Sequence, residues 1–158
     1  MTRTEIISDL SNYFKVHELV GRRTYETLGD DAWQVFDTDA LHCLLIMRKG
    51  INKPFSINNW FWGGRFDERG FRSNIQEIVY KKTIQHIIYL SGHPLGKAFD
   101  FQVTGMDAES VRNWIEDNAD LFPCKIRLEW RKNGVPISWT HFDTKHKESN
   151  PKIYKFDV

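Results

Sequence analysis

The sequence of 158 residues has little cysteine, no excess of charge of either sign and no long hydrophobic run. Its two cysteines, Cys43 and Cys124, allow at most one disulfide, which excludes a disulfide-stapled scaffold, and we expect both to be free thiols. A formal net charge of +1 gives no electrostatic reason to expect nucleic-acid binding. The longest apolar run, Leu44 to Met47, is far too short for insertion in a membrane.

The N-terminus also lacks the uninterrupted apolar stretch of a signal peptide, which predicts synthesis in the cytoplasm. If the substrate lies outside the membrane, the protein would then need another route of export to reach it. Hydrophobic residues, at 41%, and aromatic residues, at 14%, are abundant enough for a folded core. The length fits a single domain, residues 1–158.

The pattern of apolar residues predicts an α+β fold, in which an antiparallel sheet has helices packed on one side. We expect residues 1–54 to be mainly helical, residues 55–144 to contain the sheet, and residues 145–158 to form a polar C-terminal tail. No repeat and no low-complexity segment divides the chain further.

Individual elements follow from local signals. Helical spacing predicts one helix that begins at a cap formed by Asp30 or Asp31 and ends near Gly50. Alternation over residues 98–103 predicts a half-buried strand, followed by a helix that Asp107 caps. Asn133-Gly134 predicts a hairpin with a two-residue turn.

Two segments carry the strongest chemical signal. SGHPLGKAFD, residues 91–100, places His93 and Asp100 seven positions apart, and SWTHFD, residues 138–143, adds His141. Two imidazoles and one carboxylate are a common ligand set for a catalytic zinc ion, which keeps a fourth position open for water. Because side chains alternate along a strand, Asp100 should lie opposite the apolar core face, so we expect the metal on the exposed face of the sheet.

Residues near these ligands have supporting roles in this hypothesis. Gly96 would let the backbone turn sharply, so that both ligands of the first segment aim at one point. Asp143 and Ser91 are candidates to accept the second N–H of a ligating imidazole, because such rings usually donate that proton to an oxygen.

The same segments resemble a known family. SGHPLGKAFDF resembles the SxHxxGxAxD signature of the zinc D-alanyl-D-alanine carboxypeptidase and endolysin-type peptidase family, which shares its fold with the hedgehog signalling domain. SWTHFD resembles the WxH segment of that family, and GFRSN, residues 70–74, resembles its GYRS segment. The resemblance extends over residues 57–144 in the same order, and it is strongest to small members encoded by bacteriophages.

The resemblance implies a hedgehog/DD-peptidase-like fold and a Zn²⁺ ion held by His93, Asp100 and His141. It also implies that Arg72, with Ser73, binds the substrate, a role for which the planar guanidinium suits a carboxylate or carbonyl. The implied activity is that of a metallopeptidase, a hydrolase that cleaves D,D- or L,D-type peptide bonds in peptidoglycan stem peptides. A phage enzyme of this kind reaches the cell wall after release by a holin or as a component of the virion.

Peptide hydrolysis also requires a general base. Many family members carry this carboxylate three residues before the last histidine ligand, where this chain has Ser138. Our candidate is therefore Glu129, with Asp143 as the alternative. In a strict two-residue hairpin register, Glu129 pairs with Ser138 and points away from His141, whereas a one-residue bulge at Pro136 would turn it onto the metal face.

The presence of Ser138 supports a second hypothesis, in which the chain is a catalytically weak or inactive zinc-binding module that serves recognition or structure on the same fold. The aromatic-rich loop of residues 60–66 also has two interpretations. It forms a wall of the substrate groove, or its tryptophans close the hydrophobic core.

Overall fold

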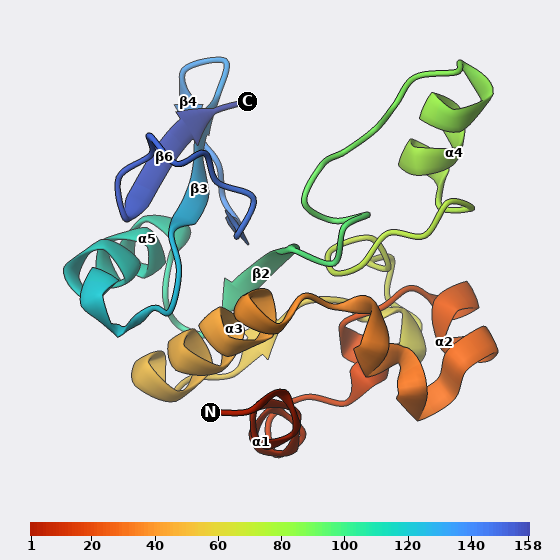
Figure 1. Ribbon diagram of the computed structural model, residues 1–158, viewed down its shortest axis with the longest axis horizontal. Coiled ribbons are helices and arrows are strands. Elements are labelled where there is room, and N and C mark those ends of the chain that lie inside the picture. The colour runs from red at the N-terminus through yellow and green to blue at the C-terminus, as the bar shows by residue number, and fades with distance from the viewer.

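The computed structural model describes residues 1–158 (Figure 1). The helices are α1 (Arg3–Leu10), α2 (Arg22–Leu28), α3 (Thr38–Ile51), α4 (Glu77–Ile84) and α5 (Ala108–Asp117). Four short 3-10 helices are η1 (Val16–Glu18), η2 (Gly29–Val35), η3 (Trp60–Trp62) and η4 (Ala119–Leu121). The strands are β1 (Phe55–Ser56), β2 (Ala98–Val103), β3 (Ile126–Lys132), β4 (Val135–Pro136), β5 (Thr140–Asp143) and β6 (Ile153–Asp157). None of the helices combines the length and the apolar character that crossing a bilayer requires.

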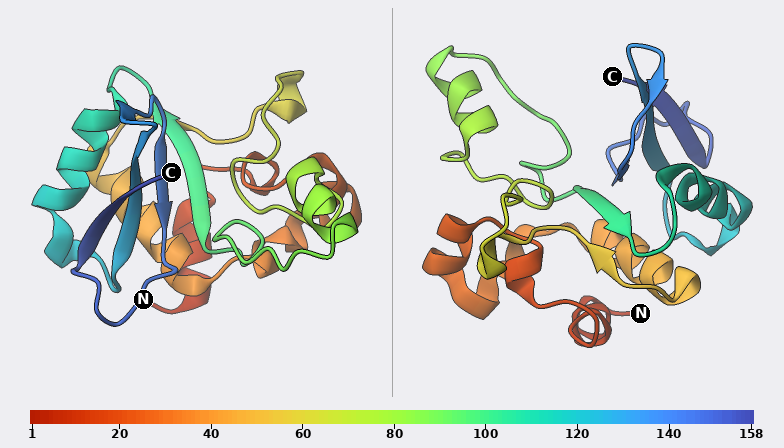
Figure 2. Two further views of the ribbon diagram at one scale, coloured as in Figure 1. Left: turned by 90° about the horizontal axis from the view of Figure 1, so that it is seen from above. Right: turned by 180° about the vertical axis from the view of Figure 1, so that it is seen from behind.

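The predicted α+β class is confirmed, and the strands form one sheet in the order β1-β2-β5-β3-β4. All neighbours along this path are antiparallel. β6 pairs with β3 in the parallel direction. The prediction of an entirely antiparallel sheet is therefore wrong for this strand. The segment interpreted as a polar tail therefore contains a strand, which lies beside β3 in Figure 2.

One hydrophobic core joins the N-terminal helices to the sheet. Phe99 and Phe101 are fully buried in it, as the alternation along β2 predicts. Phe99 stacks on Phe36 and Phe101 stacks on Phe55, which fixes β2 against the N-terminal third of the chain. Asp100 consequently projects from the other face of the strand.

The prediction of a single helix beginning at Asp30 or Asp31 was wrong. Residues 29–35 form η2, and α3 begins only after Asp37. The carboxylate of Asp37 accepts hydrogen bonds from the backbone N–H groups of Asp39 and Ala40, so it is the stronger N-cap. Its extended backbone conformation interrupts the apolar periodicity that had suggested one continuous helix.

Two other expectations are confirmed. The Asp107 side chain accepts a hydrogen bond from the backbone N–H of Ser110 and caps α5. Cys43 and Cys124 are both free thiols, although their sulfur atoms lie 3.8 Å apart.

The hairpin turn is as predicted, but most of its register is not. Asn133 and Gly134 have φ values of 52° and 79°, which are typical of a type I′ turn. Only the two pairs next to the turn follow the two-residue register. Farther along, Leu128 pairs with Phe142 and not with Trp139, because three extra residues bulge out between β4 and β5.

A buried arginine from α5 holds this bulge. Arg112 has no exposed surface, and its guanidinium donates to the carbonyl oxygens of Ile137 and Trp139, each at 3.3 Å. Its Nη2 also donates to the Glu109 carboxylate at 3.0 Å. Because the bulge adds an odd number of residues, it reverses which side chains of β3 share a face with those of β5.

Candidate metal centre

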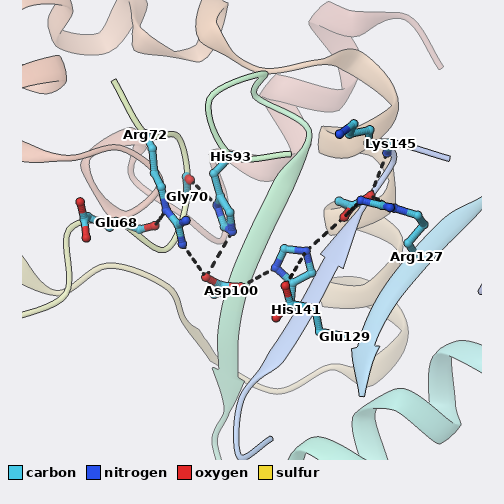
Figure 3. Close-up of polar contacts among 10 residues, drawn as sticks. Glu68, Gly70, Arg72, His93, Asp100, Arg127, Glu129, His141 and Lys145 are labelled. Atoms are coloured by element: carbon cyan, nitrogen blue, oxygen red, sulfur yellow. Dashed lines mark hydrogen bonds and ion pairs between the residues drawn. The ribbon is translucent and has the colours of Figure 1, made fainter. Parts of the chain in front are cut away.

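Three candidate ligands meet at the middle of the sheet. His93 comes from the loop before β2, Asp100 from β2 itself, and His141 from β5, where it pairs directly with Asp100. One potential ligand atom from each residue lies within 4.8 Å of the other two. The residues are 3, 8 and 4% exposed, so the cluster is covered. The prediction that it would lie on the exposed face of the sheet is therefore wrong. This buried group could bind a metal ion (Figure 3).

The ring of His93 is oriented by a backbone carbonyl. Its Nδ1 lies 2.7 Å from the Gly70 oxygen, which accepts the Nδ1 proton and leaves the lone pair of Nε2 facing Asp100 at 3.3 Å. Gly70 packs closely on the Leu19 carbonyl oxygen, which would lie 1.8 Å from a Cβ at this position. We had proposed Ser91 for this orienting role, but its hydroxyl is covered and forms no hydrogen bond.

The ring of His141 is oriented by Asp143, as proposed from the sequence. Its Nε2 lies 3.2 Å from Asp143 Oδ2, while Nδ1 lies 2.7 Å from Asp100 Oδ1. Asp143 is itself fixed by Arg127, whose Nε and Nη2 each donate to it at 2.8 Å, and by the backbone N–H of Lys145 at 2.9 Å. Both imidazoles thus direct one nitrogen at the centre of the cluster and bond the other to an oxygen.

The charges at the cluster are strongly coupled. Burial opposes ionisation of Asp100, but His93 and His141 outweigh it and hold the pKa of this carboxyl well below its usual range. Burial likewise lowers the pKa of His141, yet Asp100 and Asp143 outweigh it and raise this pKa to about 10. Burial dominates at His93 and lowers its pKa. The arrangement therefore stabilises one positive charge beside Asp100, where a bound cation could replace the His141 proton.

Glu129 lies on the same side of the sheet as the cluster. The shifted register directs its carboxylate towards His141, with Glu129 Oε1 at 3.8 Å from His141 Nε2. Burial, more than any other cause, raises the pKa of Glu129, and the nearby Asp100 and Asp143 carboxylates add to this effect. Unlike Asp143, Glu129 has no hydrogen bond to an arginine, so its carboxylate oxygens have more capacity left for other hydrogen bonds.

The two residues expected to bind substrate separate in the structure. Arg72 donates from Nε to the Glu68 carbonyl at 2.7 Å and from Nη2 to Asp100 Oδ2 at 3.2 Å, beside the cluster (Figure 3). Ser73 does not line the cavity of the cluster but two neighbouring cavities. Its hydroxyl is covered and has no hydrogen-bond partner. The structure therefore brings Arg72, but not Ser73, to the metal cluster.

The cluster opens into a cavity of about 720 Å³. One wall comes from β3, β5 and β6 and includes Glu129. The facing wall is apolar, formed by α4 and the loop that follows it with Ile78, Ile88 and Leu90, all of which are exposed. Lys145 joins the two walls, since its Nζ donates to the Leu90 carbonyl at 2.5 Å. The cavity thus has one apolar and one charged wall.

The donor set could hold a divalent metal ion. Two imidazole nitrogens and one carboxylate oxygen, each with its orienting partner in place, match a site with three protein ligands. Three ligands leave a coordination position for water or substrate. The chemistry that a bound metal ion could supply at such a position is Lewis-acid activation.

Sequence reasoning missed the groups that orient the ligands. The Gly70 oxygen is a backbone atom, so no side chain signals it, although Gly70 opens the GFRSN segment. Arg127 could have been found, because it lies two residues before Glu129 on the same strand face. Comparisons with protein-family models, with curated proteins and with solved structures gave no match for this chain.

The aromatic-rich loop has neither of the expected positions. Trp60, Phe61 and Trp62 form η3, and none of them lines the metal cavity. Phe61 and Trp62 are 51 and 64% exposed, so they do not close the core.

Proposed function

We propose that this protein is a zinc-dependent peptidase that cleaves peptide bonds in bacterial peptidoglycan stem peptides. The observation that carries the proposal is the position of Glu129. A partly desolvated carboxylate, 3.8 Å from the His141 Nε2 that faces Asp143, lines the same cavity of about 720 Å³ as the buried two-histidine, one-aspartate cluster. The substrate class comes from the resemblance of three ordered motifs to the D-alanyl-D-alanine carboxypeptidase and endolysin-type family.

Each residue has a defined role in this proposal. A divalent ion held by His93, Asp100 and His141 supplies polarisation of the scissile carbonyl when it is bound. Glu129 accepts the proton of the attacking water and returns it to the leaving amine. Its raised pKa suits this exchange, since a base must also be able to act as an acid in the second step.

Arg72 binds the substrate. Its guanidinium lies at the border of the cavity, where it can grip a carboxylate or a peptide carbonyl of the stem peptide. Asp143 holds the His141 ring and is saturated by Arg127, so we assign it to positioning and not to proton transfer. We also propose a hedgehog/DD-peptidase-like fold and a phage-encoded role in lysis or in the virion, both on the basis of the same resemblance.

Metal content and digestion of purified peptidoglycan test the proposal together. Wild-type protein should contain one zinc ion per chain, and His93→Ala should lose it, whereas His86→Ala, at an exposed histidine outside the cluster, should retain it. Peptide release, followed by mass spectrometry, should be abolished by a chelator. Glu129→Gln should keep the zinc but lower the rate by about 10² to 10⁴-fold. Glu148→Gln, whose side chain is 97% exposed, is the matched control and should leave the rate unchanged.

The outcomes separate the two hypotheses from the sequence. Zinc binding without any peptide release would favour the catalytically inactive module, which Ser138 at the usual carboxylate position suggests. Absence of stoichiometric metal would refute both. Full activity of Glu129→Gln would keep the peptidase but remove Glu129 as its base.

A further inference from the structure

Two cysteines that are far apart in the sequence meet at the hydrophobic core. Cys43 lies in α3 and Cys124 lies in the segment between η4 and β3, so the two positions are 81 residues apart. Their sulfur atoms nevertheless lie 3.8 Å from each other. The chain has no other cysteine, so each thiol has only the other as a partner within the molecule. The fold therefore brings together the two ends of the single disulfide that the chain could form.

Only a local movement separates these thiols from bonding distance. Sulfur atoms in a disulfide are about 2.05 Å apart, so the two must approach each other by about 1.8 Å. Cys124 belongs to no helix or strand and is only partly buried, so of the two it is the residue that can move. Rotation about its χ1 bond shifts the sulfur without displacing α3.

The two thiols differ in access and in acidity. Cys43 has no exposed surface, whereas Cys124 is partly exposed. The hydrogen bond from the Cys43 thiol lowers the pKa of Cys124. The positive charge of Lys152 adds to this lowering of the pKa, while burial and Asp39 oppose it. The same hydrogen bond, together with burial, raises the pKa of Cys43. Cys124 is thus the thiol that a reagent in solvent reaches and the one that ionises more readily.

We propose that Cys43 and Cys124 are a redox modification site, which closes to a reversible disulfide when the chain meets a small disulfide such as oxidised glutathione. The thiolate of Cys124 attacks one sulfur of oxidised glutathione, which forms a mixed disulfide and releases one glutathione thiolate. Cys43 then loses its proton to that thiolate, and its sulfur attacks the Cys124 sulfur and releases the second glutathione. The two protein thiols together lose two electrons, which reduce one oxidised glutathione to two glutathione thiols.

The bond would join the N-terminal helices to the sheet. The closed loop would span residues 43–124, which include His93 and Asp100 of the metal cluster. A cross-link over so long a loop lowers the entropy of the unfolded chain, so the oxidised protein should be the more stable form.

The chemistry of the two thiols does not depend on peptidase activity. Only the setting in which the bond forms rests on the proposed function, because an enzyme that acts on peptidoglycan works outside the reducing cytoplasm, where disulfides persist.

Peptide mapping after oxidation tests the proposal. The folded full chain is incubated with millimolar oxidised glutathione at mildly alkaline pH, remaining thiols are alkylated, and the digest is analysed by mass spectrometry without reduction. The product should be a single chain in which the peptides of Cys43 and Cys124 are joined, with an intact mass lower by that of two hydrogen atoms. Dithiothreitol should restore both thiols. Oxidation should also raise the Tm by about 4 to 16 °C.

Two variants and one control test the order of the steps and the role of the fold. Cys43→Ala should stop at one glutathione attached to Cys124, because no second thiol can attack that mixed disulfide. Cys124→Ala should keep Cys43 as a free thiol, because Cys43 has no exposed surface in the folded chain. Wild-type protein in urea is the control, because there the two thiols are 81 positions apart without a structure that holds them together, and mixed disulfides with glutathione should predominate.

The map of the wild-type chain is decisive even if a variant fails to fold. The proposal is overturned if the folded chain keeps both thiols free, if it accumulates the mixed disulfide alone, or if the bond joins two chains. Equal yields of the cross-link in folded and urea-denatured protein would also overturn it, because the fold would then not select the pair. A cross-link that leaves the Tm unchanged or lowers it would overturn the stabilising role. None of these results bears on zinc content or peptide release, so they leave the proposed function untouched.

Discussion

Arg112→Met is expected to lower the free energy of unfolding by about 3 kcal/mol. The guanidinium is fully buried and donates to the carbonyl oxygens of Ile137 and Trp139 in the bulge between β4 and β5. Hydrogen bonds to a charged group contribute about 1.5 to 3 kcal/mol each, and the distances of 3.3 Å place both at the lower end. The pair with Glu109 adds little, because that carboxylate is 48% exposed.

The matched control has the same chemistry at the surface. Arg23 pairs with Glu26 three residues along α2, as Arg112 pairs with Glu109 along α5, but its side chain is 75% exposed. Arg23→Met should change stability by less than about 1 kcal/mol. Urea denaturation of both variants measures the difference. Thermal unfolding should show a fall of about 6 to 12 °C for Arg112→Met, given the length of the chain.

The same substitution also tests how the site is built. Loss of the bulge would restore the two-residue register and turn Glu129 away from His141, while His93, Asp100 and His141 would remain together. Arg112→Met should therefore retain zinc but lose peptide release. A variant as stable as wild type would refute the energetic argument. A destabilised variant with unchanged activity would show that Arg112 does not control the position of Glu129.

Three other predictions concern the cluster itself. Gly96 has a φ of 67°, and a Cβ there would lie 2.0 Å from the Val35 carbonyl oxygen. Gly105 has a similar φ of 70° without such a clash, so Gly105→Ala should lower the free energy of unfolding by about 1 to 2 kcal/mol and Gly96→Ala by clearly more, as measured by urea denaturation. Equal losses of stability would contradict this prediction. In protein freed of metal by a chelator, burial lowers the pKa of His141, but Asp100 outweighs this effect and raises the pKa to about 10. The protonated ring should therefore stabilise the folded state fully below pH 6.5, and this stabilisation should be lost as the pH rises to about 10. Zinc binding near pH 7 should accordingly release about one proton, measured by calorimetry in buffers of different ionisation enthalpy, and no release would refute the charge assignment. Asp143→Asn should weaken zinc binding by about 10 to 100-fold in a chelator competition, because the ring of His141 loses its orienting carboxylate, and unchanged affinity would exclude that role.

Local signals predicted the elements whose stability is local. The strand over residues 98–103 and the Asp107 cap both depend on interactions within a few residues, and both are present, although five of the six strand residues are buried and the strand is not half-buried as predicted. The start of α3 was misplaced because Asp30, Asp31 and Asp37 are chemically equivalent caps, which the sequence alone does not distinguish; in the structure Asp37 is the cap, and its neighbour Phe36 stacks on Phe99. The pairing of β6 with β3 joins residues more than twenty positions apart, and no local pattern specifies it.

The candidate ligands were accessible to sequence reasoning for a different reason. His93 and Asp100 belong to one short segment, and a strand pairing brings His141 opposite Asp100. Their orienting partners were harder to predict, because one is the backbone oxygen of Gly70, which has no signature of its own. Asp143 was predictable because it shares a strand face with His141.

The position of Glu129 depends on the number of residues in one bulge. Side chains alternate with a period of two, so only an odd insertion between β4 and β5 places Glu129 on the face of His141. The sequence left open a strict two-residue register or a one-residue bulge at Pro136, whereas the structure has three extra residues, which turn Glu129 to the same face as a one-residue bulge would because both numbers are odd. What the sequence could not supply is the group that stabilises the longer bulge. Arg112 lies on α5, away from the bulge in sequence, and its fully buried charge is satisfied by the two carbonyl groups that it binds there and by Glu109.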